Sequence, residues 1–126
     1  MRIINILLCV VVLLIISGCS EKSEMDILDT LTKTEEHFKQ LSEVDTVATS
    51  FDGKKDIKFR IMVEGTLTEK QAQTLFEEIL NNLKKYSNQS KFWNSYNGYF
   101  DIKNYDNGVI YEATKIIGAD LKIVTK

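Results

Sequence analysis

The apolar run at the start of the chain decides which residues are left to form a folded domain. Residues 3–16 are apolar except for Asn5, and Arg2 is the only charged residue before Glu21. A helix that crosses a membrane needs about twenty apolar residues, whereas this run has about fourteen and is typical of an export signal. The folded domain is therefore expected to begin after this run.

Two small residues and a cysteine follow the apolar run. Residues 16–19 (Ile-Ser-Gly-Cys) resemble the lipobox of bacterial lipoproteins, in which the chain is cut before the cysteine and the sulfur carries diacylglycerol. The resemblance implies a signal peptide at residues 1–18, lipidation at Cys19, a short tether at residues 19–23, and a lipid-anchored location on the outer face of the cell membrane. Two or more acyl chains hold a protein firmly on a bilayer. The alternative is that residues 1–18 stay uncut as a membrane anchor and that Cys19 carries no lipid.

The remaining residues suffice for one domain, expected at residues 24–126. Removing 18 residues from 126 leaves 108, the size of one ordinary domain. Of the two cysteines, Cys9 would leave with the signal and Cys19 would carry lipid, so packing alone must stabilise the domain. With a formal net charge of −2, the chain has no excess of basic residues with which to bind nucleic acid.

Two stretches have the periodicity of amphipathic helices. In residues 23–44 the apolar stripe includes Ile27, Leu31 and Phe38, and Ser23 is the expected N-cap. In the second stretch Thr68 and Gln71 have the spacing of a capping box. Its apolar stripe consists of Ala72, Leu75, Phe76, Ile79, Leu80, Leu83 and Tyr86. Both helices are expected to pack on a sheet.

Alternating residues and turn signals predict five strands. Asp52-Gly53 joins strands at 46–51 and 56–63, Asn107-Gly108 joins strands at 99–106 and 109–116, and a last strand follows Gly118. The second hairpin is expected to place Ile102 opposite Ala113, Lys103 opposite Glu112 and Asn104 opposite Tyr111, with Val109 on the core side and Ile110 outward. The predicted fold class is α+β: a two-layer sandwich in the order α-β-β-α-β-β-β, with two helices on one face of an antiparallel sheet.

No local motif for catalysis or cofactor binding is visible. The carboxylates are scattered, no glycine-rich phosphate loop is present, and the single histidine, His37, has no second ligand near it in the sequence. We therefore expect a protein that is not an enzyme and binds no metal, cofactor or small-molecule substrate.

Aromatic residues crowd the last third of the chain. Trp93, Tyr96, Tyr99 and Tyr105 lie in a polar segment or at positions expected to face outward, and they are the candidate partner-binding residues. The competing interpretation is that aromatics favour strands and cores, which is preferred for Phe100 and Tyr111.

The length, the lipobox and two aromatic stretches, at residues 92–96 and 105–108, together resemble the entry-exclusion lipoproteins of Bacillus integrative and conjugative elements. The resemblance implies that the protein blocks redundant transfer of the element by acting on a polytopic channel protein of the donor's type IV secretion system. Two other roles stay open. One is a ligand-sensing or substrate-presenting lipoprotein with a pocket lined by Phe92, Trp93 and Tyr111. The other is an inhibitor of a wall-active enzyme or toxin.

Overall fold

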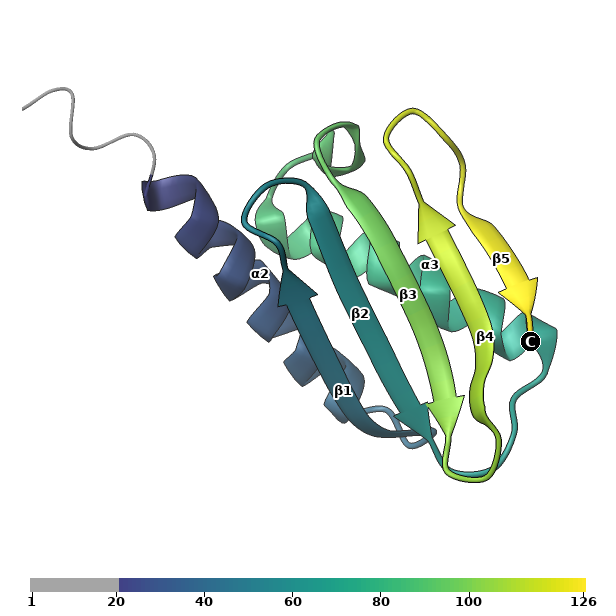
Figure 1. Cartoon of the computed structure of the whole chain (residues 1–126). Coiled ribbons are helices and arrows are strands. Elements are labelled where there is room, and N and C mark those ends of the chain that lie inside the picture. Colours follow the sequence, from purple (N-terminus) through teal and green to yellow (C-terminus); the bar gives the residue numbers. More distant parts are fainter. Residues whose placement is uncertain (1–20) are drawn as a thin grey trace, which may run out of the picture.

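The computed structural model describes residues 21–126, and its side chains can be followed from Asp26 onward (Figure 1). The predicted signal peptide at residues 1–18 and the predicted lipidation at Cys19 lie outside the described residues. In the described part, neither helix has a stretch long and apolar enough to cross a membrane.

Two helices cover one face of a five-stranded sheet, and the other face has no helix on it (Figure 1). The strands lie in the sheet in their sequence order, β1 to β5. This arrangement confirms the predicted α+β fold and its element order. The elements are α2 (Glu21–Lys39), β1 (Val44–Phe51), β2 (Asp56–Val63), α3 (Glu69–Ser87), the 3₁₀ turn η1 (Phe92–Asn94), β3 (Asn97–Asn104), β4 (Gly108–Lys115) and β5 (Lys122–Thr125).

The sheet is mixed, so the prediction of an antiparallel sheet is wrong in one place. Strands β2 and β3 run parallel, with Phe59 beside Phe100 and Ile61 beside Ile102, whereas the other three neighbouring pairs are antiparallel. The physical reason is the connection: a helix that crosses over the sheet between two strands returns the chain to the same end. Helix α3 makes this crossover between β2 and β3.

Helix α2 begins earlier and ends earlier than the periodicity predicts. It starts at Glu21, inside the predicted tether, so the predicted N-cap Ser23 lies within the helix. It ends at Lys39, and Val44 begins strand β1. Only Ser20 stands between Cys19 and the first helical residue.

Helix α3 begins where its capping box predicts. The backbone N–H of Gln71 donates to Thr68 Oγ1 (3.2 Å), and the Thr68 N–H donates to Gln71 Oε1 (2.9 Å). These bonds satisfy two amides at the helix start, which have no partner within the helix. The helix ends at Ser87, and its C-cap residue Asn88 adopts the left-handed conformation (φ 56°).

The predicted register of the second hairpin is wrong by two residues at the middle of the strands. Ile102 pairs with Tyr111 and not with Ala113, because the turn at residues 105–107 pairs Asn104 with Gly108. A bulge at Ile110 then shifts the register by one residue between Ile102 and Lys103. The bulge also turns Ile110 toward the core, where it is half-buried, contrary to its predicted outward position. Val109, predicted on the core side, is only half-buried. Strand β3 ends at Asn104, two residues earlier than predicted.

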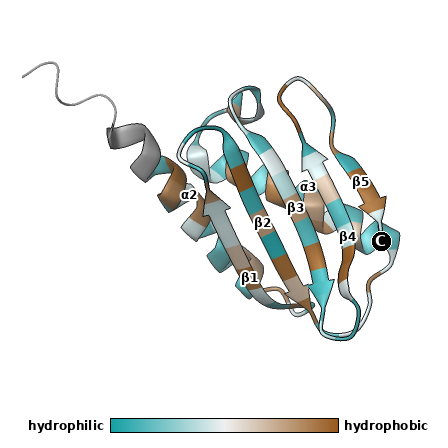
Figure 2. Cartoon of the chain, in the orientation of Figure 1, coloured by the Kyte–Doolittle hydropathy of each residue, from teal (hydrophilic) through white to brown (hydrophobic). Residues whose placement is uncertain are grey.

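The core lies between the helices and the covered face of the sheet. Apolar and polar residues alternate along β2 and β3, as the colours of Figure 2 show, and the apolar ones face the helices. In β2 the residues at these alternate positions are fully buried. The covered face consists mainly of Ile57, Phe59, Ile61, Val63, Phe100, Ile102, Tyr111 and Ala113, and the helices contribute Ile27, Leu31, Phe38, Leu75, Phe76, Ile79 and Leu83.

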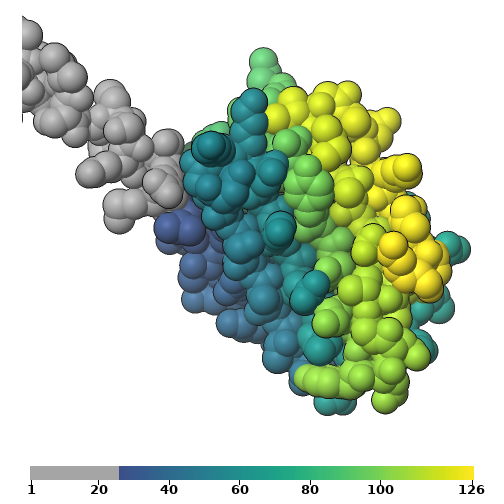
Figure 3. All heavy atoms as spheres, viewed as in Figure 1, coloured from purple at the N-terminus to yellow at the C-terminus, as the bar shows by residue number. Residues whose placement is uncertain are grey.

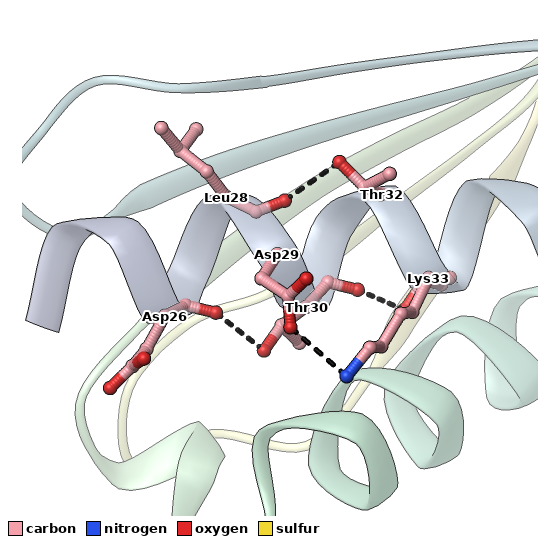
Figure 4. Close-up of polar contacts among 7 residues, drawn as sticks. Asp26, Leu28, Asp29, Thr30, Thr32 and Lys33 are labelled. Carbon is pink, nitrogen blue, oxygen red and sulfur yellow. Dashed lines mark hydrogen bonds and ion pairs between the residues drawn. The ribbon is translucent and has the colours of Figure 1, made fainter.

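The buried polar residues Thr30, Thr34 and Asn104 are all hydrogen-bonded. In α2, Thr30 and Thr34 are buried, and each hydroxyl donates to the backbone carbonyl four residues earlier (2.8 Å in both). Figure 4 shows the first of these bonds, with the Asp29–Lys33 ion pair on the same helix. In the sheet, the buried Asn104 donates its amide N–H to the Gly65 carbonyl (2.8 Å). No buried threonine of α2 therefore needs a partner outside its helix.

Candidate interaction surface

Trp93 is a packing residue, although it was predicted as a partner-binding residue. Its indole Nε1 donates to the backbone carbonyl of Leu80 (3.0 Å), and its ring meets Phe92 and Phe100 edge-on at 4.9 and 6.0 Å. These contacts fasten η1 to helix α3 and leave the ring half-buried. Trp93 therefore stabilises the packing of η1 within the domain.

Tyr96 is also held inside the domain. Its ring stacks on Phe92 (4.7 Å between centroids) and meets Phe51 edge-on (6.0 Å). The side chain is half-buried, and burial raises the pKa of Tyr96 above its usual value because the ionised form would be poorly solvated. Tyr96 therefore links η1 to the end of β1.

Tyr105 is exposed but lies apart from the other three aromatic residues. It follows β3 in the turn to β4, its side chain is 64% exposed, and its hydroxyl donates to the carboxylate of Asp45. This hydrogen bond raises the pKa of Tyr105, and the negative charge of Glu64 acts in the same direction. Tyr105 thus lies at the end of the sheet where β1 and β4 begin.

Tyr99 is the predicted residue that lies on the uncovered face of the sheet. It is the third residue of β3, is 38% exposed, and pairs with Lys58 of β2 and Thr114 of β4. The structure therefore divides the four predicted residues among three places. They do not form one patch.

We call the uncovered side of the sheet the open face. It consists of the alternate strand residues that point away from the helices, and strand atoms are visible on it in Figure 3 with no helix in front of them. A hollow of about 600 Å³ lies on this face and crosses β1 to β4. The side chains around it that belong to the open face are Ala48, Ser50, Lys58, Arg60, Tyr99, Asp101, Glu112 and Thr114.

The hollow arises from a difference in side-chain size between neighbouring strands. Ala48 and Ser50 of β1 pair with Arg60 and Lys58 of β2, so short side chains stand beside long ones. On the other side, Arg60 is held against β3 by two hydrogen bonds to Asp101, from Nε to Oδ1 and from Nη2 to Oδ2, both 2.7 Å long. The fixed guanidinium is one of the groups that line the hollow.

The charges of the open face are of both signs and partly paired. The hydrogen bond to Asp101 raises the pKa of Arg60 above its usual value, so the guanidinium stays charged at physiological pH. Glu112 is 3.1 Å from the Lys126 ammonium group at the end of the chain. A surface with paired and exposed charges of both signs fits a protein partner better than a polyanion.

Two residues of this surface were missed by reasoning from the sequence. Arg60 and Asp101 are 41 residues apart and meet only because β2 and β3 are parallel and in register. The signal was present, since a strand, a helix and a strand in succession indicate a parallel pair. With that pairing, alternation would have placed both residues on the open face.

Among the side chains that the structure describes, residues 26–126, no three His, Cys, Asp or Glu lie close enough together to hold a metal ion. The open face instead offers a tyrosine and a fixed arginine, two residue types that are enriched at the centres of protein interfaces. Comparison with protein-family models and with curated proteins found no match for this chain.

Proposed function

We propose that this chain is a lipid-anchored surface lipoprotein that binds a protein partner through the open face of its sheet. The specific role proposed is that of a binding inhibitor in conjugative entry exclusion, acting on the channel protein of the donor's type IV secretion system. The observation that supports a binding role is the hollow between β1 and β4, which Tyr99 and Arg60 help to line.

The size of the open face suits a protein partner. Neighbouring strands are about 4.8 Å apart and each residue adds about 3.3 Å, so four strands of eight residues and one of four present an area of about 570 Å². A standard protein interface covers about 800 Å² on each partner. The strands of the open face alone account for most of this area, and the hollow gives a partner side chain a place to insert.

The predicted attachment at Cys19 supports this role by fixing where the partner must be. Helix α2 begins at Glu21, so an extended link from Cys19 reaches about 7 Å. The domain would stay close to the outer leaflet, within reach of the extracellular part of a membrane channel. A partner deep in the cell wall would lie out of reach.

A mating assay tests the proposal. Recipient cells that express the intact protein should acquire the element much less often than cells without it, and Cys19→Ala should restore acquisition. Tyr99→Ser should weaken the block by about tenfold or more, as expected for a central interface residue. Equal acquisition with and without the intact protein would reject the role in entry exclusion.

Tyr105→Ser is the matched control, because it removes the same type of side chain from the end of the sheet. It should leave the block unchanged. If Tyr105→Ser abolished the block and Tyr99→Ser did not, the partner would contact the far end of the sheet, and the open face would be rejected as the binding surface.

The ligand-sensing alternative requires a pocket among Phe92, Trp93 and Tyr111. Phe92 is fully buried, Trp93 packs against it, and the Tyr111 hydroxyl donates to the Leu67 carbonyl (2.8 Å). These rings fill the space between α3 and the sheet, which gives this alternative less support than the open face. An inhibitor of a wall-active enzyme would protect cells from lysis and leave mating unaffected, so the same strains separate the two roles.

A further inference from the structure

The two outer strands of the sheet differ in how well they are protected from pairing with another chain. Strand β5 has four residues, begins with Lys122 and is followed by Lys126, whereas β1 has eight residues and contains no lysine or proline. Short length, lysine and proline are the usual features that keep an edge strand from pairing. In the part of the chain that the structure describes, β1 has a strand on one side only (Figure 1). Strand β1 is therefore the edge that is open to pairing.

The hydrogen bonds of β1 alternate between its two sides. The Asp52 N–H donates to the Asp56 carbonyl (3.1 Å), and this pair is in register with the antiparallel ladder of β1 and β2. Counted back from Asp52, every second residue of the strand bonds to β2, and the residues between them point their backbone N–H and C=O groups to the free side. These residues are Val47, Thr49 and Phe51.

The edge is regular along these residues. The register shift of β1 lies between Val44 and Thr46, at the start of the strand, and the pairing from Thr46 to Phe51 is uninterrupted. A bulge in the middle of the strand would twist the edge away from a new strand. The regular stretch instead offers N–H donors and C=O acceptors at the spacing of a β-ladder.

Helix α2 lies beside this edge, on the covered side of the sheet (Figure 1). The Thr49 hydroxyl donates to Glu35, which places that face of α2 next to β1. Leu28 is two turns earlier on the same face and is 52% exposed. Figure 4 shows it on the same side of the helix as Thr32. The side of α2 next to the edge therefore presents an apolar side chain.

The occupant that fits this edge is a single extended strand. Backbone groups that alternate at strand spacing are satisfied by the backbone of another strand. A second copy that paired through β1 would bring its own α2 against the first, because α2 lies along this edge (Figure 1). A single strand takes only about 4.8 Å of width beside β1 and leaves α2 in place.

We propose that the β1 edge binds an extended segment of a partner protein, which adds a sixth strand to the five-stranded sheet. The side chains of the segment that face the helices are apolar and contact Leu28, and those between them continue the open face. The inference goes beyond the proposed function, because it uses backbone groups of β1 and depends neither on lipidation nor on entry exclusion.

Amide hydrogen exchange followed by NMR tests this edge residue by residue. In the full-length chain in detergent micelles, the N–H groups of Val47, Thr49 and Phe51 should exchange rapidly and that of Ala48 slowly. The probe is a capped peptide of alternating valine and threonine with a lysine at each end. In millimolar excess it should slow exchange at the three edge residues by about tenfold or more. The control is the same peptide N-methylated along its length, which should slow none of them.

Two variants at one position test the backbone contact. Thr49→Pro removes an N–H that points away from β2, and proline is tolerated on an edge strand. Both Thr49→Pro and Thr49→Val lose the hydroxyl bond to Glu35, so only the backbone donor distinguishes them. Peptide binding should fall by about tenfold in Thr49→Pro and should change little in Thr49→Val.

A second pair of variants leaves the strand intact. Leu28→Ser removes the apolar side chain beside the edge and should weaken peptide binding several-fold. The control is Val124→Ser, which removes an exposed apolar side chain from β5, at the other edge of the sheet, and should leave binding unchanged. If Thr49→Pro did not fold, this pair would decide.

Four results would overturn the proposal: slow exchange of the edge amides in the free chain, equal effects of the two peptides, equal binding by folded Thr49→Pro and Thr49→Val, or equal binding by the Leu28 and Val124 variants. Protection that rose with protein concentration in the absence of peptide would assign the edge to a second copy and reject a partner strand. None of these measurements involves mating, so their outcome is separate from that of the mating assay.

Discussion

The two faces of the sheet are formed by alternate residues of the same strands, yet they have opposite character. In β2, Phe59 is buried against Phe38 of α2, whereas the next residue, Arg60, is exposed and reaches across to Asp101. The covered face is continuous and apolar, and the open face has charges of both signs around a hollow. The difference separates two tasks: the covered face stabilises the fold, and the open face is left to contact a partner.

The largest expected effect tests the covered face. Phe59→Ala should lower the free energy of unfolding by about 3–5 kcal/mol, because it leaves a cavity beside Phe38 in the middle of the sheet. Lys58→Ala, one residue earlier on the open face, should change stability by less than about 0.5 kcal/mol. Urea unfolding followed by circular dichroism measures both. Similar losses in the two variants would contradict the division between the faces.

A glycine on the covered face should give the next largest effect. The ring of Phe100 lies over Gly98 so closely that an added Cβ would be 2.2 Å from the ring atom Cζ. Phe100 is itself packed against Phe76 and Trp93, so the ring has little room to move. Gly98→Ala should therefore cost about 1–3 kcal/mol in urea unfolding.

The double variant Gly98→Ala/Phe100→Leu isolates this contact. A smaller side chain at position 100 gives the new methyl group space, so the double variant should lose less stability than the sum of the two single variants. Strict additivity would show that the cost of Gly98→Ala comes from somewhere other than the ring.

A smaller effect is expected on the open face. Asp101→Asn removes the charge from the bidentate pair with Arg60, whose side chain is half exposed, and should cost less than about 1 kcal/mol. The cost should shrink further as salt is added, because salt screens exposed charges. Glu112→Gln, which loses a single contact to Lys126, should cost less still. A loss of several kcal/mol at Asp101 would mean that the open face also stabilises the fold.

The smallest effect is expected at the β1–β2 turn, which belongs to neither face. Hydrogen bonds from the backbone, first of all from Lys54, lower the pKa of Asp52 below its usual value of 3.8. A lowered pKa means that the ionised carboxylate stabilises the folded state above about pH 4 and that this stabilisation is lost as the pH falls. Asp52→Asn should therefore be slightly less stable than the parent at neutral pH, with the gap closing under acid conditions. A gap that stays constant in a pH series of urea unfolding curves would contradict this assignment.

Local signals in the sequence predict most of the covered face. The capping box at Thr68 and Gln71 and the turn at Asp52-Gly53 act over a few residues, and each appears where it was expected. The second hairpin is also present, but its turn is residues 105–107, and Gly108 already belongs to β4. Alternation also identifies the buried positions of β2 correctly. These features depend on neighbouring residues alone, so a single sequence suffices to find them.

The residue contacts on the open face could not be predicted from local signals in this way. Its central pair, Arg60 and Asp101, depends on strand direction, which alternation does not specify. The bulge at Ile110 shifts the register by one residue and has no clear local signal. The packing of Trp93 could not be predicted for a related reason, because its polar surroundings in the sequence gave no sign that η1 turns its ring onto α3.

The early start of α2 also has a mechanical consequence. Ile27, two turns into the helix, is already buried, so a pull on the chain ahead of Glu21 would pass directly into the core. Such a force would act along the axis of α2 and shear it past β1, where the Thr49 hydroxyl donates to Glu35. A force along α2 would have to break several contacts between α2 and the sheet at the same time. The domain should therefore withstand a larger force applied in this direction than one that separates a terminal strand from the sheet one hydrogen bond at a time.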